Sequence, residues 1–108
     1  FGKSLDDFTP IGPWIVTKDE FKNPPALPIR SYVNGELRQD SNTELMINGI
    51  EKVICELTQG MTLQAGTIIA MGTPAGVGMG FEPPRFLNSG DVVTCEIEGI
   101  GTMMNKIK

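Results

Sequence analysis

An Asn-Gly pair at residues 34 and 35 limits the fold of this chain more than any other feature. It lies between two short runs of alternating apolar and polar residues, in the stretch PIRSYVNGELRQD at residues 28–40. Asn-Gly suits a two-residue type I′ turn, because both turn positions need a positive φ, and such a turn joins neighbouring antiparallel strands. The sequence therefore predicts a β-hairpin with strands at about 29–33 and 36–39.

Four further stretches predict β-strands. Residues 91–97 and 101–107 combine alternation with β-branched side chains around a turn at Gly99, which is typical of a second antiparallel pair. The apolar runs at residues 14–17 and 67–71 predict two more strands, and the Trp that opens the first run is expected in the core.

One amphipathic helix is predicted after the hairpin. Ser41 or Asn42 is a suitable N-cap, and Gly60 lies where a helix commonly stops. The apolar residues between them recur at helical spacing: Met46, Ile50, Val53, Ile54 and Leu57. This face is expected to be core or dimer surface, and the predicted fold class is a mostly β, α+β domain with one helix.

Composition narrows the partners that the chain can have. Its 108 residues, 40% of them hydrophobic, are enough for one domain with a modest core. The formal net charge of −4 and the scattered Lys and Arg argue against nucleic acid, so small molecules or proteins are the expected partners. No apolar run reaches the length of a membrane span, and we expect a soluble, cytoplasmic protein. A mature chain rarely begins with Phe, so we expect that residue 1 is not the native beginning.

Two cysteines and no histidine restrict the available chemistry. Cys55 and Cys95 are far apart and form no Cys-x-x-Cys pair, so we expect buried free thiols instead of a disulfide framework or a zinc site. Histidine is the commonest general base and the commonest transition-metal ligand. Ser-His and Cys-His catalysis by this chain alone is therefore excluded.

A Gly-Lys-Ser sequence at residues 2–4 is similar to the end of a phosphate-binding loop. In such a loop the Lys-Ser pair opens a helix whose N-terminal amides bind phosphate. Pro10, Gly12 and Pro13 follow too closely for a helix of useful length. A nucleotide site is therefore not expected, which leaves Lys3 as either a solvated surface residue or an active-site cation on a loop.

A glycine- and proline-rich stretch at about residues 72–90 is the only long irregular region predicted. Its sequence is GTPAGVGMGFEPPRFLNSG. Loops of this length inside a compact domain are usually functional or disordered. Four glycines in nine residues let the backbone approach a ligand closely and offer open amides to an anion. Composition alone leaves two alternatives, a ligand-binding loop and a flexible surface loop.

Several stretches together resemble the C-terminal half of the fumarylacetoacetate hydrolase family. They occur in the family's order and cover nearly all of residues 2–107: GKSLDDFTPIGPWIVT, YVNGELRQDSNT, IIAMGTPAGVGMG, PPRFLNSGDVV and CEIEGIGTMMNKI. No single stretch is decisive, but the ordered set is specific. Residues 1–108 are thus identified as the C-terminal portion of a catalytic domain of this type, without its N-terminal part. They resemble most the branch of the 2-hydroxyhepta-2,4-diene-1,7-dioate isomerases and acylpyruvases.

The resemblance implies a mixed β-sandwich or β-roll, usually a homodimer, that binds Mg²⁺ or Mn²⁺. It also implies hydrolysis, decarboxylation or isomerisation of 2-oxo and 2-hydroxydienoate dioic acids, through an enolate that the metal and a lysine stabilise. Lys3 matches the family's active-site lysine. Gly72, Thr73 and Pro74 match the loop that lines the substrate pocket, where a hydroxyl and open amides can hold a carboxylate.

The family's metal ligands are not matched in this chain, and its Glu-x-Glu pair and further aspartate are expected upstream of Gly2. Glu96 and Glu98 imitate the Glu-x-Glu spacing, but they match a C-terminal strand of the family and are expected on a solvated or cross-strand-paired face. Asp6 and Asp7 offer the oxygen ligands that Mg²⁺ prefers. The family commonly has a small or hydroxyl residue at the second of these positions, so no residue of the chain is predicted as a metal ligand.

Two functions remain open at this point. The first is the metal-dependent enzyme, and the second is a non-catalytic homologue that keeps the fold and a small-acid pocket or dimer interface without the metal. Three arginines could bind a second substrate carboxylate, although a surface role is the default for such residues: Arg30, Arg38 and Arg85. The last of them, beside the long loop, is the one to test.

Overall fold

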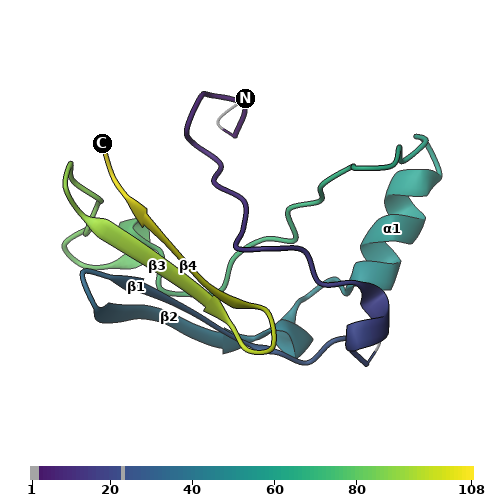
Figure 1. Cartoon of the computed structure of the whole chain (residues 1–108), viewed down its shortest axis with the longest axis horizontal. Helices are drawn as coiled ribbons and strands as arrows, with labels where there is room; N and C mark the ends of the chain where they lie inside the picture. Colours follow the sequence, from purple (N-terminus) through teal and green to yellow (C-terminus); the bar gives the residue numbers. More distant parts are fainter. Residues whose placement is uncertain (1–2, 23) are drawn as a thin grey trace.

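The computed structural model describes residues 3–22 and 24–108, and its regular structure is mainly one antiparallel sheet (Figure 1). The strands are β1 (Pro28–Val33), β2 (Glu36–Asn42), β3 (Val92–Ile97) and β4 (Gly101–Lys106), and they are ordered β2-β1-β3-β4. One α-helix, α1 (Ile50–Thr58), is found in the described residues, with 3-10 turns at Lys18–Glu20, Thr43–Leu45 and Gly78–Gly80. The predicted mostly β fold with a single helix is confirmed.

The hairpin forms where the Asn-Gly pair predicted it. Asn34 and Gly35 have φ values of 51° and 82°, and Val33 pairs with Glu36 across the turn. The second strand runs to Asn42, three residues beyond its predicted end, and the register shifts between Ser31 and Tyr32. A register shift of this kind, as in a β-bulge, bends a strand and redirects the side chains near it.

The sheet has two chemically different faces. Strands β1 and β3 are its central pair, and cross-strand partners have side chains on the same face. One face carries Ile29 and Ser31 of β1 with Ile97 and Cys95 opposite them. On the other face Arg30 lies between carboxylates of both neighbouring strands.

The helix begins later than predicted. The side-chain oxygen of Asn42 does accept a hydrogen bond from the backbone N–H of Glu44 (3.0 Å), but it caps only the 3-10 turn Thr43–Leu45. Gly49 then takes an extended conformation and is the N-cap of α1, since glycine is a poor helix former. The helix ends near the predicted stop, where the N–H of Gly60 donates to the carbonyl of Leu57. No helix in the described residues has the length and apolar character needed to cross a lipid bilayer.

The two other predicted strands and the predicted burial are wrong. Residues 14–17 and 67–71 form no strand, because a strand needs a ladder partner and neither segment pairs with another described residue. The side chain of Trp14 is 63% exposed and does not lie in a core. Cys55 and Cys95 are free, as predicted, but they are exposed.

The described chain has no buried core. None of its described residues is buried, and the side chains of Ile47 and Ile15 are 99% and 89% exposed. The accessible surface is 8579 Å², whereas a compact protein of 11.7 kDa exposes about 5,900 Å². The radius of gyration is 15.3 Å against about 13 Å for a compact domain of this length. In Figure 1 the helix stands away from the sheet, which leaves an open arrangement, while the N-terminal segment approaches the start of β4, where Pro13 and Trp14 lie beside Gly101.

Candidate functional site

A pocket of about 790 Å³ lies between the sheet, the helix and the start of the glycine-rich loop. Its apolar walls come from the sheet and from the helix with the segment before it: Ile29, Ile97, Met46, Ile50 and Val53. Gly72, Thr73 and Pro74 also line it. Apolar walls with a few converging polar groups are typical of small-molecule sites. The three residues predicted as substrate-binding are thus brought together at one pocket.

Thr73 is held by a side chain of strand β2. The Nε2 atom of Gln39 donates to Oγ1 of Thr73 (2.8 Å) and to the carbonyl oxygen of Pro74 (2.9 Å). The other end of the same amide, Oε1, accepts from Oγ of Ser31 on β1 (2.8 Å). Gln39 and Ser31 are cross-strand partners. The sheet therefore sets the position of the hydroxyl on the loop.

The loop also passes close to the backbone of β2. Gly76 has a φ of +102°, and a Cβ added there would overlap the carbonyl oxygen of Arg38. Gly72 has a φ of +109°, but an added Cβ would meet nothing within 4 Å. Gly76 is therefore required both for its backbone conformation and for the close approach to β2, whereas Gly72 is required for its backbone conformation alone.

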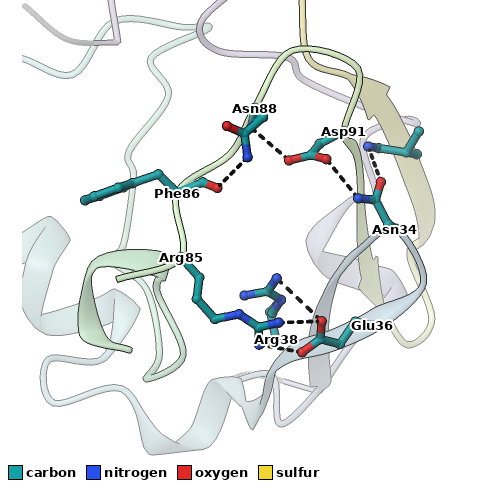
Figure 2. A network of polar contacts seen from close by, with 8 residues as sticks. Asn34, Glu36, Arg38, Arg85, Phe86, Asn88 and Asp91 are labelled. Carbon is teal, nitrogen blue, oxygen red and sulfur yellow. Dashed lines mark hydrogen bonds and ion pairs between the residues drawn. The ribbon is translucent and has the colours of Figure 1, made fainter. Parts of the chain in front are cut away.

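A cluster of charged and aromatic side chains fixes the middle of the loop against the hairpin, and Figure 2 shows its charged members, Glu36, Arg38 and Arg85. Nη1 and Nη2 of Arg85 donate to the two carboxylate oxygens of Glu36, at 2.7 and 3.0 Å. Nη2 of Arg38 lies 3.5 Å from the same carboxylate. Both guanidinium carbons lie 5.3 Å from the centre of the Phe81 ring, within the range of cation–π attraction. We call these four residues the arginine clamp.

The arginine clamp affects the pKa of Glu36 and occupies the side chain of Arg85. The hydrogen bond from Arg85 is the main cause that lowers the pKa of Glu36, helped by the charges of both arginines. Arg85 was the arginine chosen for a test of binding to a substrate carboxylate. In the structure it already binds the carboxylate of Glu36. Nε of Arg38 is buried and has no hydrogen-bond partner within the described residues.

The end of the loop is tied to the hairpin turn (Figure 2). Nδ2 of Asn34 donates to Oδ1 of Asp91 (2.8 Å), while its Oδ1 accepts from the backbone N–H of Val92 (2.9 Å). The backbone N–H of Asn88 donates to Oδ2 of Asp91 (2.8 Å). These bonds lower the pKa of Asp91, the backbone amide of Asn88 most of all and then the Asn34 amide. The loop is therefore anchored at its start, its middle and its end.

Lys3 lies apart from this pocket. It is exposed on the N-terminal segment, where its carbonyl accepts from Oγ1 of Thr9 (2.7 Å), and it is not among the residues that line the pocket. Residues 3–8 form turns and bends, and Gly2 lies outside the described residues, so the absence of a nucleotide loop stays a prediction. Lys3 and Thr73 are not brought together, so the catalytic role of Lys3 stays a prediction.

The carboxylates of the described residues form no metal centre. No group of three or more His, Cys, Asp or Glu side chains there is arranged to hold a metal ion. Glu96 lies 3.6 Å from Nη1 of Arg30, its cross-strand partner, as a paired face predicts. The carboxylate of Asp7 binds the ammonium of Lys108, whose hydrogen bond lowers the pKa of Asp7. This part of the chain by itself does not fit a Mg²⁺ or Mn²⁺ site.

Two residues that hold the loop against the sheet escaped the sequence reasoning. Gln39 and Glu36 both lie on β2, and their loop partners follow 34 and 49 residues later. A regular register from the Asn-Gly turn would have placed Gln39 opposite Arg30, and only the register shift between Ser31 and Tyr32 brings Gln39 opposite Ser31. Nothing in the pattern would have linked either residue to the loop.

The chain is matched over residues 1–108 by the family model described as "Fumarylacetoacetate (FAA) hydrolase C-terminal". It is 51% identical, over 106 residues, to the oxaloacetate tautomerase YisK of Bacillus subtilis. The match covers 98% of this chain and 35% of that protein. The chain thus spans about a third of the length of this curated relative.

Solved structures of the same kind superpose closely. A fumarylacetoacetate hydrolase from Exiguobacterium antarcticum is 51% identical with a TM-score of 0.94, over 99% of this chain and 38% of that one. A 2-hydroxyhepta-2,4-diene-1,7-dioate isomerase from Mycobacterium marinum is 42% identical with a TM-score of 0.81, over 95% and 37%. A maleylpyruvate hydrolase from Sphingobium sp. SYK-6, in complex with manganese(II) and pyruvate, is 39% identical with a TM-score of 0.85, over 97% and 37%.

Proposed function

Since the chain belongs to the fumarylacetoacetate hydrolase C-terminal family, we propose that it forms part of an enzyme that interconverts enol and keto forms of 2-oxo dioic acids. Oxaloacetate is the first substrate to test. The observation that carries this choice is the 51% identity to an oxaloacetate tautomerase over nearly the whole chain. The isomerase and hydrolase relatives support the wider class, because an enol or enolate of a 2-oxo acid is common to these reactions.

The pocket supports this proposal through the groups that it presents. Its apolar walls offer contacts to the carbon skeleton of a small acid, and the hydroxyl of Thr73 offers one hydrogen bond to a carboxylate oxygen. Lys3 is proposed to supply a positive charge to the oxygen on which negative charge develops, as its match to the family's lysine implies. Substrate binding and orientation are the parts that the described residues can perform.

We further propose a divalent metal and a homodimer. The metal is suggested by the manganese(II) and pyruvate bound to the maleylpyruvate hydrolase relative. Its chemistry would be stabilisation of an enolate oxygen. Its ligands would have to come from outside the residues described here, in which no suitable cluster is found.

The test is the decay of enol-oxaloacetate, followed by its ultraviolet absorption, with the intact protein. We expect acceleration over the buffer rate that a chelator abolishes and added Mn²⁺ or Mg²⁺ restores. The variant Lys3→Met should lose about 100-fold or more of the rate, the usual cost of removing one group that stabilises an oxyanion. Lys18→Met, which removes another exposed lysine, is the matched control and should keep full activity.

The competing function is a non-catalytic domain that binds small acids. It rests on the absence of a metal cluster among the described residues. It predicts that pyruvate binds in a calorimeter while enol decay stays at the buffer rate under every metal condition. That pair of results would replace the enzyme proposal by the binding one.

A further inference from the structure

We propose that Gln39 is a positioning residue that makes the Thr73 hydroxyl a hydrogen-bond donor toward the pocket, and so selects ligands that present a carboxylate there. This inference rests on the proposed function, because it concerns the same pocket. The inference goes beyond the proposed function because it assigns a role to a residue of β2 that is not itself among the residues lining the pocket. The side-chain amide of Gln39 makes three hydrogen bonds, to Ser31, Thr73 and Pro74.

The orientation of the Gln39 amide follows from the chemistry of its neighbours. The carbonyl oxygen of Pro74 can only accept, so the amide atom 2.9 Å away must be the nitrogen. The amide oxygen then faces Oγ of Ser31 at 2.8 Å, which must donate to it. Ser31 and Gln39 are paired within the sheet, so neither can turn away without breaking the other's bond.

The amide in turn fixes the direction of the Thr73 hydroxyl. An amide nitrogen has two hydrogens, and here one is directed at Pro74 and the other at Oγ1 of Thr73. The hydroxyl is therefore an acceptor toward Gln39, and its own proton has to point elsewhere. Thr73 is among the residues that line the pocket, so on this proposal the proton is directed to a ligand bound there.

A donor held in this way favours an anionic oxygen. Hydrogen bonds to a carboxylate are shorter and stronger than those between neutral groups. Without Gln39 the hydroxyl could rotate and donate to a neighbouring protein carbonyl, and the ordering of the donor would then be a cost of binding. Gln39 is thus expected to act on affinity for the acid group and not on the chemical step.

The experiment measures dissociation constants of pyruvate and of its neutral methyl ester by calorimetry, on the intact protein with Mn²⁺ present. The variants are Gln39→Met, which removes all three amide bonds at similar volume, Thr73→Val, which removes the hydroxyl, and the double variant. Gln39→Glu reverses the bond to Thr73, since a carboxylate only accepts. Gln64→Met, at an exposed glutamine in another segment, is the matched control. Thermal unfolding of each variant shows whether it is folded.

We expect pyruvate to bind about tenfold more weakly to Thr73→Val, the factor for one lost hydrogen bond to a charged group. Gln39→Met should bind pyruvate about three- to tenfold more weakly than the wild type. A folded Gln39→Glu variant should lose more affinity for pyruvate than Thr73→Val does. The methyl ester should bind all variants within about twofold of one another. In the double variant the Gln39 change should add nothing. For oxaloacetate turnover, KM should rise while kcat stays close to wild type, because binding of the acid group is lost equally in the ground and transition states.

Three results would overturn the inference: Gln39→Met binds pyruvate like Gln64→Met, pyruvate and the ester weaken in parallel, or the wild type binds no pyruvate. The proposed function fails separately. If the wild type does not accelerate enol decay but binds pyruvate with the expected variant pattern, the enzyme proposal fails and the role of Gln39 stands. If the wild type accelerates enol decay and Gln39→Met has no effect on KM, the enzyme proposal stands and the proposed role of Gln39 fails.

Discussion

At the scale of single residues, the candidate site depends on side chains whose partners lie far along the chain. Glu36 and Arg85 are 49 residues apart, and Gln39 and Thr73 are 34 apart. Each pair joins β2 to the glycine-rich loop. The loop is therefore positioned by specific contacts with the sheet, and its conformation does not depend on its own sequence alone.

The carboxylate of Glu36 should make stability sensitive to acid. Its pKa is lowered in the folded protein, chiefly by the hydrogen bond from Arg85, so it stabilises the fold when ionised. That contribution is complete above the pKa of the unfolded chain, near the ordinary value of 4.5, and is lost as the pH falls below it. We expect Glu36→Gln to be less stable at pH 7 and to show a flatter dependence of its unfolding midpoint on pH below about 4.5.

The measurement is thermal unfolding of the intact protein between pH 3 and pH 7, pH values chosen on either side of the expected transition. Glu98→Gln removes an equal charge at another exposed position and is the control. If the two variants give the same pH profile, the ion pair with Arg85 has no effect on stability.

At the scale of elements, the loop and strand β2 fit together only because a glycine stands where they meet. Gly76→Ala should destabilise by about 1 kcal/mol for its positive φ and by roughly a further 1–3 kcal/mol for the overlap with the Arg38 carbonyl. Gly66→Ala is the control, because Gly66 has a φ of +85° and its added Cβ would meet nothing within 4 Å. Denaturant unfolding of both variants should separate the two costs. Equal losses would mean that the loop can move away from β2 freely.

The elements that sequence reasoning predicted correctly are those specified by local patterns. The Asn-Gly turn with its alternating flanks defines β1 and β2, and the turn at Gly99 does the same for β3 and β4. Residues 14–17 and 67–71 have strand-like composition, but pairing is decided by a neighbour, and the described chain provides none. Composition predicted the long loop at about residues 72–90, and the family resemblance selected Gly72, Thr73 and Pro74 within it, which line a pocket but whose role in binding stays a prediction. Gln39 needed a contact that no local pattern encodes.

At the scale of the whole molecule, the exposed apolar surface is the dominant property. The chain exposes roughly 2,700 Å² more than a compact protein of its mass, and none of its described residues is buried. An excess of this size is comparable to the surface buried in permanent interfaces. We expect this surface to be covered by further polypeptide in a stable protein.

This expectation can be measured on the 108 residues produced alone. They should bind the dye ANS strongly and unfold without a sharp cooperative transition, as states with exposed apolar surface do. Intact protein of the length of the relatives should do neither. A cooperative, dye-free transition of the 108 residues at micromolar concentration, with a monomeric mass, would contradict it.

The central pairing of β1 with β3 also sets the order of events during synthesis on the ribosome. The β1–β2 hairpin emerges early and can close by itself, but the inner edge of β1 waits for residues 92–97, which are translated after the helix and the whole glycine-rich loop. Unpaired strand edges readily join other nascent chains. Slow translation between the hairpin and β3 would therefore lengthen the period of risk, and a chaperone that shields a strand edge would be of most use to the nascent protein there.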